Sequence, residues 1–120
     1  MAVKDLLKQM IERKASDLFY RAGGTPRLRI DGKLVDADDK VLSVEQVEKA
    51  AEELTTPQQR DELKRSLDID FALYLKEFSY RFRVSIFMQR NWPSIVIRSV
   101  KDTIQTFEEL NLPAEVLKKL

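Results

Sequence analysis

The chain has 120 residues, of which 43% are hydrophobic and 34% charged, with 21 basic and 20 acidic side chains and a formal net charge of +1. This length predicts one domain, able to bury roughly two-thirds of the surface that its unfolded chain exposes, and no apolar run approaches the ~20 residues of a bilayer span. Because histidine and cysteine are absent, disulfides, the usual zinc ligands and nucleophile pairs that use either residue are excluded. A cytosolic protein is the default expectation, since residues 1–5 carry an acid and lack the apolar core of a secretory signal.

The first third of the chain predicts a helix, a strand and a β-hairpin. Apolar residues at helical spacing predict an amphipathic helix that ends near Lys14, with a stripe formed by Val3, Leu6, Leu7, Met10 and Ile11. A strand begins at Leu18, and Gly23-Gly24-Thr25-Pro26 predicts a loop. Asp31-Gly32 separates two short strands, residues 27–30 and 33–35, and predicts a hairpin because a type I′ turn requires positive φ at both central residues.

Two helix starts are recognisable in the middle of the chain. Ser43 followed by Gln46 is a capping box that opens a second helix, whose buried stripe is Val47, Ala50, Ala51 and Leu54. Thr56-Pro57, with Gln59 three residues past the cap, is a second start signal, because proline is favoured at the first helical position. This third helix is expected to end near Ser66.

Three strands are expected after these helices. Alternating apolar residues predict a strand over residues 69–75, and residues 76–79 turn the chain into a longer strand that starts at Tyr80. Asn91-Trp92-Pro93 predicts another turn, and residues 94–100 form the partner strand. The order of elements predicts an α+β fold with an antiparallel sheet flanked by helices.

The strand that starts at Tyr80 belongs to a segment with concentrated positive charge. Its residues alternate, so that Tyr80, Phe82, Val84, Ile86 and Met88 share one face while Arg81 and Arg83 project from the other. No acid occurs from residue 79 to residue 101, where the basic residues are Arg81, Arg83, Arg90, Arg98 and Lys101. Guanidinium groups on rigid strands suit forked, charge-assisted bonds to carboxylate or phosphate, although a charged run is about as often a solvated surface.

Two further features have two interpretations each. Asp68 and Asp70 are two residues apart on one strand face, which is the spacing of a paired-carboxylate site but more often only the wet side of a strand. Trp92, beside Pro93, is either an exposed anchor for a partner or a turn aromatic that folds back over the sheet.

The chain contains no complete phosphate-binding loop. Its single Gly-Lys pair, Gly32-Lys33, has Arg27 and Leu34 where a Walker A motif requires Gly and Ser or Thr. We therefore expect these 120 residues alone to be catalytically inactive. Pro113 begins another helix, whose apolar stripe ends at Leu120 without a C-cap, so residues 101–120 are expected to connect to a further domain.

Landmarks along nearly the whole chain occur in the order known from one family. They are Ala15-Ser16-Asp17-Leu18, Gly23-Gly24-Thr25-Pro26, Arg29-Ile30-Asp31-Gly32-Lys33-Leu34, Arg81-Phe82-Arg83-Val84-Ser85-Ile86-Phe87 and Gln89-Arg90. In this order they resemble the N-terminal domain of the type IV pilus retraction ATPases, the PilT/PilU-like twitching-motility proteins of the secretion ATPase superfamily. The tail from Thr106 to Pro113 is similar to the linker into their ATPase domain. The chain departs from the family at Ser79-Tyr80, where Gly often precedes the Arg-Phe-Arg run, and at Gly24-Thr25-Pro26, where many members have a double Pro.

The resemblance implies a PAS-like domain over residues 1–100 and, over residues 101–120, a linker to a RecA-like ATPase domain with Walker A and B motifs. Six such chains form a ring, in which each N-terminal domain packs on the ATPase domain of the neighbouring subunit. The family is cytoplasmic and is held at the inner membrane by the pilus machinery. ATP, with Mg²⁺, is bound between the two domains of one chain, and arginines of the N-terminal domain reach its phosphates. The matching positions here are Arg81, Arg83, Arg90 and Arg98.

Two other functions fit the sequence less well. A stand-alone PAS-like ligand sensor or interaction module would need polar anchors in a pocket, whereas the interior-facing residues are almost all apolar. RNA binding would use the aromatics that interleave with arginine after Tyr80, but the glycine of an RNA-recognition strand is missing. The net charge of +1 also argues against strong affinity for a phosphate backbone. We therefore expect no nucleic-acid partner. Because the chain lacks histidine and cysteine, we also expect no metal ligand in it.

Overall fold

The computed structural model describes residues 3–89 and 92–100, which form three α-helices and a six-stranded sheet. The elements in chain order are α1 (Val3–Glu12), β1 (Asp17–Arg21), β2 (Arg27–Ile30), β3 (Lys33–Asp36), α2 (Val44–Leu54), α3 (Pro57–Ser66), β4 (Asp68–Leu75), the 3-10 turn η1 (Lys76–Phe78), β5 (Tyr80–Gln89) and β6 (Trp92–Val100). Arg90 and the expected linker, residues 101–120, lie outside the described residues.

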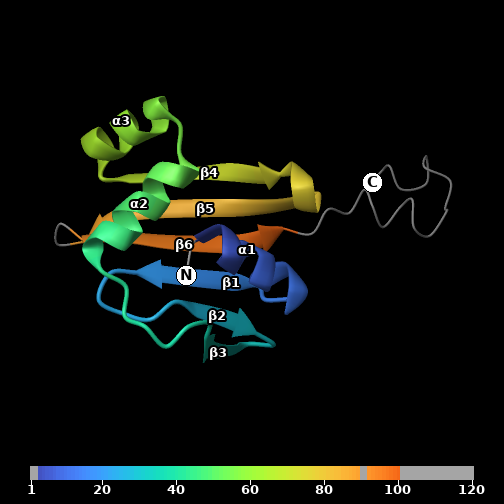
Figure 1. Cartoon of the computed structure of the whole chain (residues 1–120). Helices are drawn as coiled ribbons and strands as arrows, with labels where there is room; N and C mark the ends of the chain where they lie inside the picture. The colour runs from blue at the N-terminus through green and yellow to red at the C-terminus, as the bar shows by residue number, and fades with distance from the viewer. Residues whose placement is uncertain (1–2, 90–91, 101–120) are drawn as a thin grey trace, which may run out of the picture.

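The sheet is antiparallel throughout, with the strand order β3-β2-β1-β6-β5-β4. The first strand therefore lies inside the sheet, paired with β2 on one side and with the last strand, β6, on the other (Figure 1). Helices α1 and α2 cross one face, and α3 lies beside the edge strand β4 (Figure 1). The predicted α+β class is confirmed.

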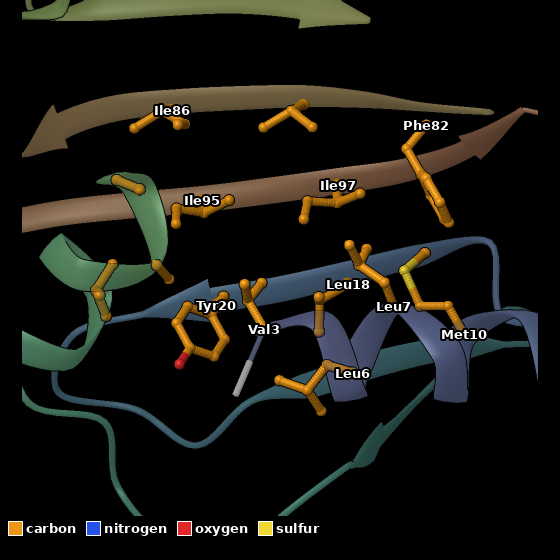
Figure 2. Close-up of a cluster of buried hydrophobic side chains, with 14 of the residues drawn as sticks. Val3, Leu6, Leu7, Met10, Leu18, Tyr20, Phe82, Ile86, Ile95 and Ile97 are labelled. Carbon is orange, nitrogen blue, oxygen red and sulfur yellow. The ribbon is translucent and has the colours of Figure 1, made fainter. Parts of the chain in front are cut away.

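The hydrophobic core lies between this covered face and the helices. Residues directly opposite each other on four neighbouring strands form one fully buried row, which consists of Leu28, Leu18, Ile97 and Val84, each 0% exposed. Figure 2 shows Leu7 and Met10 of α1 gathered over this part of the sheet. Since full burial of such a side chain contributes about 1.5–3 kcal/mol, the apolar stripe of α1 fixes the helix on this face.

Helices α2 and α3 both begin with the capping boxes that the sequence predicts. Ser43 Oγ accepts from the N–H of Gln46 at 3.1 Å, while the N–H of Ser43 donates to the Gln46 side chain at 2.8 Å. Thr56 and Gln59 make the same reciprocal pair at 3.2 and 2.9 Å. Helix α3 ends at Ser66 as expected, whereas α1 ends at Glu12, two residues before the predicted Lys14.

The prediction of a turn over residues 91–93 is wrong for Trp92 and Pro93, which belong to strand β6. Strand β6 begins at Trp92, which is opposite Gln89, and Pro93 is opposite Met88. A proline near the first residue of a strand removes no bond from the middle of the ladder, so pairing continues up to the connection. Trp92 covers Gly23, where an added Cβ would lie 2.9 Å from a ring carbon, while 52% of the tryptophan stays exposed.

Candidate functional site

The sheet face turned away from α1 and α2 is covered by none of the described helices, and we call it the open face (Figure 1). Side chains alternate along a strand, so Phe82 and Val84 of β5 point into the core while Arg81 and Arg83 point to the open face and are exposed. The predicted division of this strand into an apolar face and an arginine face is therefore confirmed.

Charged side chains form a row across the open face. Arg29 of β2 is directly opposite Asp17 of β1, Asp17 is opposite Arg98 of β6, and Arg98 is opposite Arg83 of β5. Opposite residues in an antiparallel sheet have Cβ atoms ~4.5–5.5 Å apart. The antiparallel register thus brings the guanidinium-bearing residues Arg83 and Arg98 side by side, with no acid between them in the row.

Asp17 is the buried member of this row. Its side chain is only 10% exposed, and it pairs with the Nε atoms of two arginines: Arg98 at 3.2 Å and Arg29 at 3.4 Å. The hydroxyl of Ser16 also donates a hydrogen bond to this carboxylate, at 2.7 Å. Such charge-assisted bonds are the stronger kind, so Asp17 holds arginines from two strands in defined positions.

A hollow of about 340 Å³ opens beside Arg98, lined by Asp70, Arg83, Ser85, Val96 and Arg98. The terminal Nη2 of Arg83 lies 3.5 Å from Oδ1 of Asp70, and both side chains are more than half exposed. Asp70 is opposite Ser85 and therefore reaches Arg83 diagonally. The paired-carboxylate interpretation finds no support here, because the side chain of Asp68 makes no hydrogen bond or ion pair with any residue the structure describes.

The hollow has the chemistry of an anion site. Like charges directly opposite each other in a sheet are destabilising, and a bound anion between Arg83 and Arg98 would relieve that repulsion. Guanidinium groups on rigid strands offer several N–H donors in a fixed fork, which matches phosphate or carboxylate oxygens. The Ser85 hydroxyl adds a neutral donor at the same place.

The other two predicted arginines differ in their positions. Arg81 projects from the same face as Arg83, but it lies opposite Val100, outside the hollow, with its Cζ 6.0 Å from the centre of the Tyr74 ring. Arg90 lies outside the described residues. Of the three predicted arginines that the structure describes, it brings Arg83 and Arg98 together in the hollow and leaves Arg81 outside it.

Sequence reasoning did not connect the two acids of this site, Asp17 and Asp70, with the arginines. Asp17 follows a predicted helix and precedes an apolar strand, so nothing local marks it as a partner of arginines far along the chain. Only the pairing of β1 with β6 brings it to Arg98. The alternation of β4 did place Asp70 on the wet face, but its contact with Arg83 depends on the β4–β5 register.

A second hollow of about 270 Å³ lies at the other end of the open face. Its lining includes Phe19, Arg21, Thr25, Arg27 and Arg29. Arg29 lies over the Phe19 ring at 5.5 Å, and Arg27 pairs with Asp36 at 3.3 Å. In the part of the chain that the structure describes, no group of three or more acidic residues could hold a metal ion. None of the described helices has the length and apolar character that crossing a membrane requires.

By fold and site, the chain is an α+β domain in which Arg83 and Arg98 lie side by side in a hollow of the open sheet face. Solved structures with a similar fold include a pilus retraction motor and an ATPase. The crystal structure of the pilus retraction motor PilT with bound ADP matches 98% of this chain and 34% of that protein, with a TM-score of 0.79 and 28% identity. The Legionella pneumophila ATPase DotB matches 97% of this chain and 33% of its own, with a TM-score of 0.72. At 20% identity, the match to DotB supports the fold only.

Sequence comparison leads to the same group of proteins. The type IV pilus ATPase PilU of Pseudomonas aeruginosa is 38% identical over 120 residues, and the type IV pilus retraction ATPase PilT of the same organism is 30% identical over 120 residues. A twitching motility protein of Neisseria gonorrhoeae is 29% identical over 90 residues. No protein-family model matches the chain.

The chain is thus a homologue of the PilT and PilU type IV pilus ATPases, and its fold is that of the N-terminal domain of a PilT-like ATPase. The resemblance found in the sequence landmarks is confirmed. The chain spans about a third of the length of these relatives, 31% of PilU and 34% of PilT.

Proposed function

We propose that this chain is the N-terminal regulatory and assembly domain of a hexameric ATPase that powers type IV pilus retraction and twitching motility. In this proposal Arg83 and Arg98 contact the phosphates of ATP bound to the ATPase domain of the same subunit. One observation carries the proposal: Arg83 and Arg98 are directly opposite each other in a hollow of the open face. Two adjacent, exposed guanidinium groups can offer an anion several charge-assisted hydrogen bonds at one place.

The chemistry of phosphoryl transfer explains what such arginines would contribute. Negative charge spreads over the oxygens of the transferring group, and catalysis depends mainly on positioning and electrostatic stabilisation. Donors held on β5 and β6 need little reorganisation, because both strands are anchored by a fully buried core face. Mg²⁺ would accompany the ATP phosphates, with its protein ligands supplied by the ATPase domain.

The assembly follows from the same proposal. The domain would pack against the ATPase domain of the neighbouring subunit in a homohexamer, so that movement of the ring is coupled to closure over the nucleotide. The protein would be cytoplasmic and held at the inner membrane by the pilus machinery. This part of the proposal is supported by the homology to pilus ATPases and by the 28% identical structure of a pilus retraction motor with bound ADP.

The test replaces Arg83 or Arg98 by alanine in the complete ATPase subunit. Each change should lower the rate of ATP hydrolysis roughly a hundredfold, which corresponds to about 3 kcal/mol of lost transition-state stabilisation, as for other phosphate-contacting donors. Arg83→Lys should restore the rate only in part, because an ammonium group lacks the forked geometry. The melting temperature of the 120-residue chain should hardly change in Arg83→Ala, since exposed substitutions usually alter stability by no more than about 0.5 kcal/mol. Arg98→Ala should lower it, because this change also removes a hydrogen bond to the Asp17 carboxylate, which is only 10% exposed.

Arg65→Ala is the matched control, because Arg65 is an exposed arginine in the last turn of α3, on a different part of the domain. This variant should hydrolyse ATP at the parental rate. If the Arg83 and Arg98 alanine variants also retain that rate, the arginines of the open face are a solvated surface and the proposed contact with ATP is wrong.

A further inference from the structure

We infer that Asp17 and Asp70 act on this anion site in opposite directions: Asp17 positions Arg98 for the ligand, whereas Asp70 competes with the ligand for Arg83. The inference rests on the proposed function, because it concerns the regulation of the same hollow. It follows from which nitrogen of each guanidinium the carboxylate occupies and from how deeply each carboxylate is buried.

The contact between Asp17 and Arg98 leaves the ligand-binding edge of the arginine unoccupied. Asp17 binds through Nε, the nitrogen nearest the backbone, at 3.2 Å. The terminal nitrogens of Arg98 donate no hydrogen bond to any described residue. Arg98 is 72% exposed, so without this contact its long side chain would sample many rotamers. Ordering such a side chain on binding costs free energy. Because the contact with Asp17 already restricts Arg98 in the unliganded fold, this cost is smaller when the ligand binds.

Asp17 itself is held in place by its surroundings. Its side chain is 10% exposed, and its carboxylate also binds Nε of Arg29 at 3.4 Å and the Ser16 hydroxyl at 2.7 Å. With two guanidinium groups beside it, its negative charge is largely neutralised towards the hollow. Its repulsion of a bound anion is therefore weaker than its effect on the position of Arg98.

The contact between Asp70 and Arg83 is of the other kind. Asp70 lies 3.5 Å from Nη2, a terminal nitrogen that a forked bond to phosphate would use. Both side chains are exposed, 60% for Arg83 and 57% for Asp70, and both line the hollow. An exposed ion pair of this type is worth only about 0.2–1 kcal/mol, so an anion can displace the carboxylate, but at a cost in affinity.

The two aspartates are separated experimentally by charge-neutralising variants in the complete ATPase subunit. Binding of adenylyl-imidodiphosphate, a non-hydrolysable ATP analogue, is measured by isothermal titration calorimetry. Asp70→Asn should tighten binding by about 1.4-fold to fivefold, the range that corresponds to an exposed ion pair. Asp17→Asn should weaken binding by about threefold to tenfold, and it should lower kcat, because Arg98 loses its orientation.

Asp68→Asn is the control for a general change in charge. Asp68 is on the same strand and the same face as Asp70, yet it makes no ion pair with any described residue. The affinity of Asp68→Asn for the ATP analogue should stay close to that of the parent. Ser16→Ala is a milder second variant, since it loosens the Asp17 carboxylate without removing its charge, and it should weaken binding in the same direction as Asp17→Asn. Ser16→Ala replaces Asp17→Asn in the test if Asp17→Asn lowers the melting temperature so far that the domain unfolds.

The outcomes separate this inference from the proposed function. If Arg83→Ala and Arg98→Ala leave the affinity for the analogue unchanged, the proposed function fails. If those variants do weaken binding, the anion site stands and the aspartate variants test this inference. The opposed roles are refuted if Asp70→Asn changes the affinity in the same direction as Asp17→Asn or Ser16→Ala. They are also refuted if these variants have the same affinity as Asp68→Asn.

Discussion

Replacing Gly23 by alanine tests how the loop after β1 is packed. Gly23 has φ of 87°, in the left-handed region, and an added Cβ would lie 2.9 Å from Cζ3 of Trp92. The substitution therefore combines backbone strain with a steric contact. Two other glycines separate these effects: Gly32 has φ of 81° but no atom within 4 Å of an added Cβ, and at Gly24 the nearest atom is 4.0 Å away, with φ outside the left-handed region.

The expected magnitudes follow from this geometry. A non-glycine residue in the left-handed region costs about 1–2 kcal/mol, which the loss of unfolded-state entropy offsets by about 0.4–1 kcal/mol. Gly32→Ala should thus destabilise the fold by about 1 kcal/mol. Gly23→Ala adds an overpacking cost of about 1 kcal/mol, near the low end of the usual range because the half-exposed indole can move, and should reach about 2 kcal/mol. Gly24→Ala should be neutral or slightly stabilising.

Urea unfolding of the 120-residue chain, followed by circular dichroism, measures these differences as shifts of the midpoint at constant slope. Trp92 is the only tryptophan, so its fluorescence should also change in Gly23→Ala and stay unchanged in Gly32→Ala. In a Trp92→Leu background, the cost of Gly23→Ala should fall to that of Gly32→Ala. Equal costs for Gly23→Ala and Gly24→Ala, or a cost that Trp92→Leu does not reduce, would refute the packing of Trp92 on this loop.

Two further predictions concern the core. Phe82→Ala should lower the free energy of unfolding by about 3–5 kcal/mol in the same urea assay, because Phe82 is 0% exposed and its removal leaves a cavity; a loss below about 1 kcal/mol would contradict this core. Burial, and to a smaller extent the charge of Glu53, raises the pKa of the Tyr20 phenol. The folded state therefore holds this proton more tightly than the unfolded state, so this contribution is complete below the ordinary pKa of about 10 and is lost as the pH rises through the folded value. Tyr20→Phe should flatten the fall in stability above pH ~10; a pH profile identical to that of the parent chain would contradict it.

The local structure could be predicted because it depends on residues close together in the sequence. The two capping boxes need only Ser43 with Gln46 and Thr56 with Gln59, and both formed as predicted. The hairpin at Asp31-Gly32 has positive φ at both residues, as its turn type requires. Alternation along residues 80–89 was enough to place the arginines on one face and the core residues on the other.

The candidate site was predictable only in part. The sequence placed Arg83 and Arg98 on two expected strands, and the family resemblance matched them to arginines that contact nucleotide. Their direct opposition depends on the β5–β6 register, and the sequence placed the start of β6 two residues late. The partners Asp17 and Asp70 had no local signal that links them to arginines. Their contacts arise from strand pairing, and each pairing is decided by burial of the opposite face of the sheet.

The sequence by itself determined the helix starts, the tight turn and the two faces of each strand, because these follow from backbone geometry and apolar periodicity within a few residues. Only the tertiary structure decided that β1 lies between β2 and β6. This strand order places Asp17 in contact with Arg98, 81 residues away in the chain. It also leaves one sheet face open to carry the arginines. The physical reason is that strand order is selected by the packing of the whole apolar face against α1 and α2, and no short stretch of sequence contains that information.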